Sequence, residues 1–285
     1  MSEFQVYKQS ISERLASYYT DVEAEQMARL LLQEAYGIPY PRLVFSDCKV
    51  SEKYAIVEAW VKRLEALEPL QYVVGHTYFH GMELLVRKGV LIPRGETEQL
   101  CQILRDRGYV SEDAITADLC TGSAAIALYL ATHGCVVEAV DISPLALEVA
   151  GENIERLGMK RLVNLRAGDL LSEQFEPFYP AYDLVVSNPP YVLDSERSEI
   201  KPHVLQMEPE LALFVPDDDG LRFYRAILGL YGSRLKVGGV FAFEINPLVV
   251  DELIELYSSA GYDVSISEDY LGRKRFLFAK KVRND

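Results

Sequence analysis

Beyond residue 94, short β-favouring runs alternate with helical stretches of ten or more residues. The β-favouring runs span residues 115–119, 136–140, 162–166, 184–187 and 240–245. Helical periodicity between them is clearest at residues 145–157 and 221–235. Parallel strands need long crossover connections, usually helices, which then cover the faces of the sheet. The alternation predicts an α/β fold with a doubly wound parallel sheet that is covered on both faces.

The two ends of the chain depart from this alternation. The tail holds two further β-favouring runs, residues 263–267 and 275–279, which predict an antiparallel pair at the edge of the sheet. The first 70 residues instead show helical spacing, and one apolar stripe consists of Phe4, Tyr7, Ile11, Leu15 and Tyr18. Residues 37–41 (GIPYP) predict a loop, and Ser51 is a candidate N-cap for the helix that follows.

We therefore predict three parts in the chain of 285 residues. Residues 1–70 form a small N-terminal helical domain, and residues 95–285 form the α/β domain. Residues 71–94 form a linker between them. Two short β-favouring runs flank Gly81 in this linker and predict a hairpin.

Composition and charge exclude several classes of protein. A hydrophobic fraction of 49% can fill a sizeable core, and no apolar run approaches the roughly 20 residues that cross a bilayer. The net charge of −14 disfavours nucleic acid as the main partner, because proteins that neutralise phosphates usually gather Lys and Arg on one face. The four cysteines show neither CxxC spacing nor histidines at ligand spacing. We predict no disulfide, no metal site and, since no export signal is visible, a cytoplasmic location.

Two strand ends carry residues suited to a nucleoside-type ligand. The loop after the first strand consists of the small residues Cys120, Thr121, Gly122, Ser123 and Ala124. Such a loop lets the backbone approach a ligand closely where a helix begins. The next strand ends at Asp141, roughly 20 residues beyond Gly122, where a carboxylate can hold the two hydroxyls of a ribose. The loop lacks a complete G-x-G-x-x-G and need cradle no phosphate, which favours S-adenosylmethionine over a dinucleotide. An ordinary strand-to-helix turn beside an acidic surface residue is the alternative.

The strand of residues 184–187 runs directly into a second motif, Asn188, Pro189, Pro190 and Tyr191. The prolines stiffen this loop, and because the first has no N–H, the loop carbonyls can point outwards. The Asn188 side chain adds an acceptor oxygen, and the ring of Tyr191 is suited to cover a planar group. The motif predicts a site that grips the N–H bonds of an amino or amide group and turns its nitrogen towards an electrophile. A proline-rich turn with a buried tyrosine is the alternative for the tetrapeptide alone.

With these motifs the chain resembles the release-factor glutamine N5-methyltransferase family, also called the HemK or PrmC family. The resemblance covers nearly the whole chain and is strongest from Pro69 to Tyr191. The 188–191 motif is shared with adenine and guanine methyltransferases. Other segments are more specific to this family than the 188–191 motif. They are PLQY at 69–72 and LIPR at 91–94 in the linker, ETE at 96–98, EPELAL at 208–213 and DGL at 219–221.

The resemblance implies a helical bundle, a hairpin linker and a seven-stranded methyltransferase domain. The implied reaction moves a methyl group from S-adenosylmethionine, leaving S-adenosylhomocysteine, to the side-chain amide of the glutamine in the Gly-Gly-Gln loop of peptide-chain release factors. By position, residues 120–124 form the cofactor loop, Asp141 holds the ribose, Asp169 and Leu170 line the adenine, and Asn188 lies between cofactor and substrate. The implied substrate site is the 188–191 motif, and its catalytic residues are Asn188, Pro189 and Tyr191.

Departures from the family pattern occur in the cofactor loop and at the residues implied to line the adenine. Glycine is usual at the positions of Cys120 and Ala124, and an aromatic residue is common at Leu170. A Cβ at a left-handed backbone position costs on the order of 1 kcal/mol, so we expect weaker cofactor binding, although Ala124 should be tolerated at the start of a helix. Asn246 also stands where the family usually has glycine, a change without a functional account in the sequence.

Three functions remain open at this point. The first is a protein methyltransferase that acts on release factors and docks them through residues 1–70. The second is a nucleic-acid amino-group methyltransferase, against which the acidic balance and the amphipathic N-terminal bundle both speak. The third is a catalytically silent homologue that binds a partner, for which the altered cofactor loop is the one supporting feature.

Overall fold

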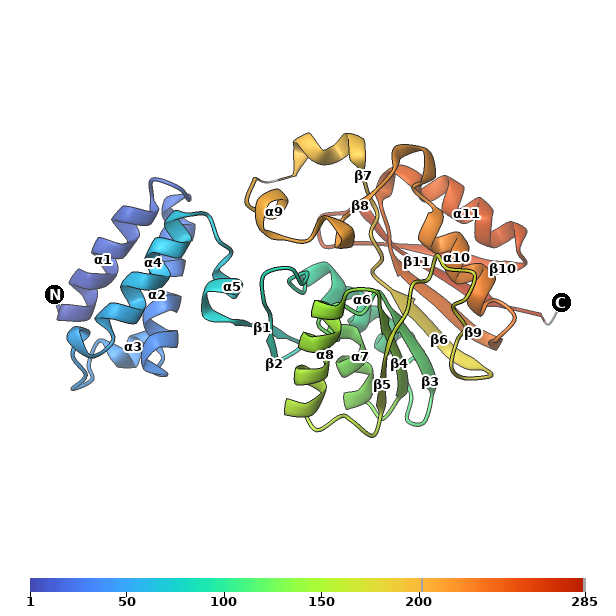
Figure 1. The fold of residues 1–285 in the computed structure, drawn as a ribbon, viewed down its shortest axis with the longest axis horizontal. Helices are drawn as coiled ribbons and strands as arrows, with labels where there is room; N and C mark the ends of the chain where they lie inside the picture. Colours follow the sequence, from blue (N-terminus) through green and yellow to red (C-terminus); the bar gives the residue numbers. More distant parts are fainter. Residues whose placement is uncertain (201, 284–285) are drawn as a thin grey trace. The chain divides into compact units, whose positions relative to one another are not determined.

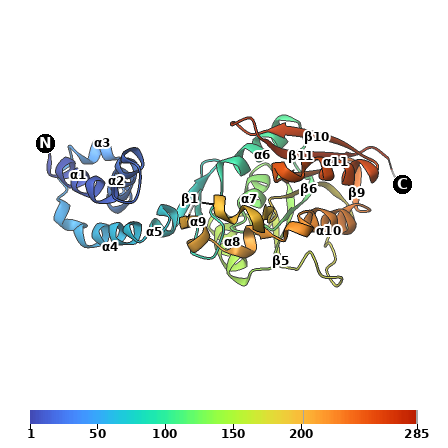
Figure 2. The ribbon, with the colours of Figure 1, turned by 90° about the horizontal axis from the view of Figure 1, so that it is seen from above.

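The computed structural model describes residues 1–200 and 202–283, which divide into two compact units. The first unit comprises Met1–His76 together with Pro202–Met207, and the second comprises the rest of the described chain. Figures 1 and 2 show the helices of the first unit and the sheet and helices of the second. Among the described residues, no helix is long and apolar enough to cross a membrane.

The first unit is helical. Its helices are α1 (Glu3–Leu15), α2 (Asp21–Tyr36), α3 (Tyr40–Leu43), α4 (Tyr54–Glu65), α5 (Leu70–Val74) and α9 (Pro202–Met207), with a 3₁₀ turn, η1, at Val50–Glu52. Its buried core includes Phe4, Ile11, Leu15, Leu31, Leu32, Val57, Val61 and Leu64. The start of α2 is fixed by a reciprocal capping box, in which the Thr20 hydroxyl accepts from the N–H of Glu23 and the Glu23 carboxylate accepts from the N–H of Thr20.

Three predictions for the first 70 residues are wrong at helix ends. Tyr18 lies beyond the end of α1 and is 52% exposed, so it does not extend the apolar stripe. Helix α3 begins inside the predicted loop, where Pro41 is tolerated because the first helical turn needs no N–H from it. Lys53 rather than Ser51 is the N-cap of α4, because Ser51 already belongs to η1.

The second unit is built on a seven-stranded sheet with the strand order β10-β11-β9-β6-β3-β4-β5. Its strands are β3 (Ile115–Leu119), β4 (Val136–Asp141), β5 (Val163–Ala167), β6 (Tyr182–Ser187), β9 (Leu235–Glu244), β10 (Tyr262–Glu268) and β11 (Lys274–Lys281). Strands β9, β6, β3, β4 and β5 pair in parallel, whereas β11 pairs antiparallel with β9 and β10 with β11. The predicted doubly wound sheet and its antiparallel edge are confirmed.

Strand β9 shows the largest difference from the predicted strand positions. It begins at Leu235 instead of residue 240, and its register with β6 shifts between the pairs Tyr182–Leu235 and Leu184–Val240. Gly238 lies inside the shifted segment with φ of 84°, a conformation that interrupts regular strand pairing. For this reason the sequence pattern of residues 235–239 does not indicate a strand.

Helices cover both faces of the sheet, as the alternation predicts. Helices α6 (Gly95–Asp106), α7 (Ala125–Thr132) and α8 (Pro144–Arg156) contribute to one core cluster, and α10 (Arg222–Tyr231) and α11 (Val250–Ser259) to the other (Figure 1). Strand residues alternate between the clusters: Val240 and Ala242 belong to the first, and Phe241 and Phe243 to the second.

The predicted hairpin is confirmed by β1 (His76–Phe79) and β2 (Met82–Leu85), which form a two-stranded sheet. Positive φ values at His80 (46°) and Gly81 (78°) are those of a tight two-residue turn. The limits of the linker, 71 and 94, stay a prediction. The remaining short elements are β7 (Val192–Leu193), β8 (Phe214–Val215), η2 (Asp194–Glu199), η3 (Glu210–Ala212), η4 (Asp217–Asp219) and η5 (Pro247–Val249).

Candidate active site

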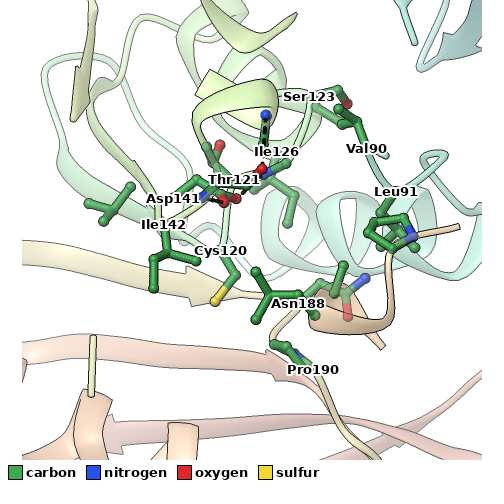
Figure 3. Close-up of a pocket in the computed structure, with 18 of the residues that line it drawn as sticks. Val90, Leu91, Cys120, Thr121, Ser123, Ile126, Asp141, Ile142, Asn188 and Pro190 are labelled. Carbon is green, nitrogen blue, oxygen red and sulfur yellow. Dashed lines mark hydrogen bonds between the residues drawn. The ribbon is translucent and has the colours of Figure 1, made fainter. Parts of the chain in front are cut away.

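A cavity opens at the carboxyl ends of β3, β4, β5 and β6, where the strand order reverses between β3 and β6. Figure 3 shows the side chains around it. The residues that the sequence predicts here and that line the cavity are Cys120, Thr121, Gly122, Ser123, Asp141, Asp169, Leu170, Asn188 and Pro190. The side chains predicted for the same site that do not line it are those of Ala124, Pro189 and Tyr191. One cavity thus joins the ends of four strands.

The loop after β3 turns through three left-handed residues, with φ of 59° at Cys120, 56° at Gly122 and 66° at Ala124. A Cβ added at Gly122 would meet no atom within 4 Å, so this residue faces open space at the cavity wall. Helix α7 begins at Ala125, and Ala124, which we expected to be tolerated at the start of a helix, is its left-handed N-cap. Cys120 and Ala124 therefore both carry backbone strain that glycine would avoid.

Gly122→Ala is expected to lower both the stability of the protein and its affinity for S-adenosylhomocysteine. The left-handed strain of about 1–2 kcal/mol is partly offset by the stiffer unfolded chain, which leaves a net loss of roughly 1 kcal/mol. Gly108→Ala is the matched control, because Gly108 has φ of 73°, an equally open Cβ position and no place in the cavity wall. Thermal unfolding should show similar losses for both variants, and calorimetry should show weaker ligand binding for Gly122→Ala alone. Equal ligand affinities would contradict the close approach at Gly122.

A buried carboxylate, that of Asp118, is hydrogen-bonded to the loop that follows β3. Asp118 is fully buried at the end of β3 and accepts from Oγ1 of Thr121 at 2.5 Å and from the N–H of Ala127 at 2.9 Å. Its Oδ1 has no hydrogen-bond partner among the described residues. Burial raises the pKa of Asp118 to about 7, although these two bonds act against the shift. The loop conformation thus depends on a carboxyl group that titrates near neutral pH.

Asp141, the last residue of β4, combines a structural contact with a place in the cavity wall. One carboxylate oxygen accepts from the N–H of Gly122 at 2.8 Å, and the other accepts from the N–H of Ser143 at 2.9 Å. Burial raises the pKa of Asp141, while the backbone N–H groups act in the opposite direction. Each carboxylate oxygen keeps further acceptor capacity, so the group can tie down the loop and still accept from a ligand.

Asn188 lines the cavity, and its side-chain amide is hydrogen-bonded to Thr97. Its Nδ2 donates to Oγ1 of Thr97 at 3.1 Å, and this hydroxyl donates to Oε2 of Glu244 at 2.8 Å. The Tyr191 hydroxyl donates to Oε1 of the same carboxylate at 2.7 Å. Burial is the main reason that the pKa of the Tyr191 phenol lies well above its ordinary value. Tyr191 thus bonds Glu244 and does not line the cavity, and the expected cover of a planar group by its ring stays a prediction.

Two further residues support this side of the cavity, and the contacts that they make were not predicted from the sequence. The Asn246 side chain donates to the carbonyl of Tyr191 at 3.0 Å and to Oε2 of Glu196 at 2.5 Å, which gives a structural role to the residue that departs from the family pattern. Glu208, the first residue of the EPELAL segment, pairs with Arg94 at 2.5 Å and accepts from the N–H of Ile92 at 3.3 Å. Arg94 itself lines the cavity.

The four histidines do not form a catalytic group with the cavity residues, none of which is a histidine. Within the described parts of the chain, no cluster of three or more His, Cys, Asp or Glu residues could hold a metal ion. The polar side chains that line the cavity are two carboxylates, one amide, one guanidinium, one thiol and four hydroxyls, from Asp141, Asp169, Asn188, Arg94, Cys120, Thr97, Thr121, Ser123 and Ser143.

Comparison with known proteins gives consistent results over nearly the whole chain. The family models for the PrmC N-terminal domain and the methyltransferase small domain match residues 8–75 and 96–207. The release factor glutamine methyltransferase of Bacteroides thetaiotaomicron is 35% identical over 95% of this chain and 98% of its own length. That of Flavobacterium psychrophilum is 33% identical over 95% of this chain and 96% of its own length.

Among solved structures, a methyltransferase from Pyrococcus furiosus matches 81% of this chain and all of its own length, with a TM-score of 0.52 and 18% identity. This likeness supports the fold alone. The sequence identities of about one third over nearly whole chains, together with both family models, show the family as well as the fold. The chain belongs to the family of release factor glutamine methyltransferases, the HemK/PrmC family, whose enzymes depend on S-adenosylmethionine.

Proposed function

We propose that this protein transfers a methyl group from S-adenosylmethionine to the side-chain amide nitrogen of the glutamine in the Gly-Gly-Gln loop of peptide-chain release factors. The observation that carries the proposal is the arrangement of one cavity. The half-buried carboxylate of Asp141 and the open backbone at Gly122 lie in the same wall as the Asn188 side chain. A nucleoside-type ligand and a planar amide can therefore meet there.

The cavity suits this cofactor in three respects. Asp141 supplies acceptors for the ribose hydroxyls, and Gly122 leaves room for close approach of a ligand to the backbone. Asp169 and the buried Leu170 provide one polar and one apolar wall, as an adenine requires. Bound there, the cofactor supplies an electrophilic methyl group on a sulfonium.

The 188–191 loop acts on the other reactant. An amide nitrogen is a poor nucleophile because its lone pair is delocalised into the carbonyl, and its proton is barely acidic before the methyl group has bonded. A general base therefore contributes little at the start, and positioning becomes the main task. We assign the Asn188 side-chain oxygen and the Pro189 carbonyl to accept the two N–H bonds of the substrate amide, which fixes its plane and directs its nitrogen.

Transfer of labelled methyl groups tests this function directly. The protein would be incubated with labelled S-adenosylmethionine and a full-length release factor, with the same factor carrying alanine in place of the Gly-Gly-Gln glutamine, and with ribosomal and transfer RNA. We expect label in the unaltered release factor alone. Label in RNA would favour the nucleic-acid methyltransferase. Cofactor binding without transfer to any of these substrates would favour the silent homologue, which the strain at Cys120 and Ala124 makes a specific alternative.

We also place the protein in the cytoplasm, where thiols stay reduced. All four cysteines, at positions 48, 101, 120 and 135, are free thiols. The net charge of −14 gives no support to a direct nucleic-acid partner, so we propose release factors as the partner.

Deleting residues 1–70 is expected to raise the release-factor concentration needed for half-maximal rate by at least about tenfold, since a docking contact separate from the reacting glutamine is lost. The deleted region supplies every buried residue of the first unit's core cluster except Val73, and residues 71–76 and 202–207 of that unit remain. Calorimetry with S-adenosylhomocysteine is the control and should show that the remaining protein still binds the cofactor product. An unchanged half-maximal concentration would show that this unit has no docking role.

A further inference from the structure

Four side chains from distant parts of the chain form one hydrogen-bonded row beside the cavity. The row runs from Asn188 through Thr97 to Glu244, with Tyr191 on the far oxygen of Glu244. Thr97 belongs to the first turn of α6, Asn188 follows β6, and Glu244 ends β9. Thr97 is 5% exposed and Glu244 is 2% exposed, so water contributes little to their hydrogen bonding.

The direction of these hydrogen bonds follows from the carboxylate. An ionised carboxylate only accepts, so the single hydroxyl proton of Thr97 is committed to Glu244. The Thr97 oxygen then has only lone pairs to offer Asn188, and it can accept from the amide nitrogen but cannot donate to the amide oxygen. The two ends of an Asn amide have nearly the same shape, and the row distinguishes them by hydrogen bonding alone.

We propose that Thr97, held by Glu244, is a positioning residue that keeps the Asn188 amide in the one orientation that presents its oxygen to the substrate. This inference rests on the proposed function, in which that oxygen accepts an N–H of the substrate glutamine. With the amide reversed, an NH₂ group would face the N–H bonds of the substrate, and two donors would oppose each other. The row therefore selects a substrate that donates hydrogen bonds at this point.

Glu244 enforces this direction only while it is ionised. Burial raises the pKa of its carboxyl, and the bonds from Tyr191 and Thr97 and the charge of Arg275 on β11 act against that shift. The other titratable groups that face it are Glu96 and Cys101 of α6 and Tyr224 of α10. A protonated Glu244 can donate to Thr97, whose hydroxyl can then donate to the Asn188 oxygen. Protonation at low pH thus removes the preference for one amide orientation.

Three variants test the role of Thr97. Thr97→Val keeps the shape and removes the hydroxyl, and we expect a single-turnover methyl-transfer rate at least about tenfold lower, with S-adenosylhomocysteine affinity within about threefold of the unaltered protein. Thr97→Ser keeps the hydroxyl and should restore most of the rate. Thr116→Val is the matched control, because it also removes a buried hydroxyl, which donates to the carbonyl of Val136 at a distance of 3.3 Å. Thr116 lies in β3 and does not line the cavity, so this variant should leave the rate unchanged.

A double-mutant cycle separates positioning from a general structural role. In an Asn188→Ala background there is no amide to orient, so Thr97→Val should cause no further loss of rate. An equal loss in both backgrounds overturns the proposal. The proposed function fails independently if the unaltered protein methylates no release factor, since that result does not depend on Thr97.

The pH dependence tests Glu244. The ratio of the unaltered rate to the Thr97→Val rate should decrease towards one as the pH is lowered and Glu244 takes up a proton. Asp118 and Asp141 also have pKa values raised by burial, but they titrate in both proteins, and their effects cancel in the ratio. A ratio that stays constant wherever the protein remains folded would remove Glu244 from the proposal.

Discussion

Asn188→Ala is expected to lower the rate of methyl transfer 10²–10³-fold, while S-adenosylmethionine still binds. The expected cost is about 2.7–4 kcal/mol, the range found when one preorganised polar contact to a transition state is removed. The substrate amide gains nucleophilicity only as its nitrogen leaves conjugation with the carbonyl, and a fixed acceptor on its N–H favours that change. Asn188 is suited to this role because its side chain lines the cavity and Thr97 holds its amide nitrogen.

The measurement is a single-turnover assay with labelled S-adenosylmethionine and an excess of enzyme over release factor. Calorimetry on the same variant separates lost transfer from lost cofactor binding. Asn188→Asp keeps an acceptor at the same position and adds a charge, so part of the activity should survive. Full methylation by Asn188→Ala would overturn the positioning mechanism.

The sheet could be predicted because its signals are local. Strands β3 and β4 lie in short runs rich in Val, Ile, Leu and Ala, β4 ends at Asp141, and Pro144 marks the start of the helix that follows β4. Parallel strands also bring their carboxyl ends to one edge of the sheet, which explains why residues 120–123, Asp141 and Asn188 line one cavity.

The supporting contacts could not be predicted because they join residues that are far apart in the sequence. Thr97 and Glu244 are separated by 147 positions, and Ile92 and Glu208 by 116. Asn153 of α8 bonds both the backbone of Leu85 in the hairpin and the carbonyl of Ser123 in the cofactor loop. Such pairings depend on how the strands are ordered in space, and no periodicity of the sequence encodes them.

Tyr191 shows the same limit on a shorter scale. The sequence places an aromatic ring directly after the two prolines, which favours a ring beside the reacting amide. In the structure the Tyr191 hydroxyl bonds Glu244, and Asn246 bonds its carbonyl. The direction of the side chain was thus set by two residues at the end of β9 and just beyond it, and the local sequence could not reveal either.

Asp141→Ala is expected to weaken S-adenosylmethionine binding by at least tenfold. Charge-assisted hydrogen bonds are worth roughly 1.5–3 kcal/mol each. The loss of two such bonds from the ribose hydroxyls would therefore weaken binding by more than tenfold, unless bonds to water replaced part of the lost energy. The structure adds a second effect, because the same carboxylate accepts from the N–H groups of Gly122 and Ser143. The variant should therefore also unfold at a lower temperature without ligand, and a loss of affinity alone would not assign Asp141 to the ribose.

A ligand that lacks both ribose hydroxyls separates the two effects. Unaltered protein should bind S-adenosylhomocysteine at least tenfold more tightly than its 2′,3′-dideoxy analogue, whereas Asp141→Ala should bind the two ligands about equally. Asp141→Asn keeps one acceptor for the loop and should show intermediate discrimination. Since burial raises the pKa of Asp141, discrimination by the unaltered protein should also decline as the pH falls and the carboxylate is protonated. If Asp141→Ala still discriminates between the ligands as the unaltered protein does, the carboxylate serves the loop alone and another group holds the ribose.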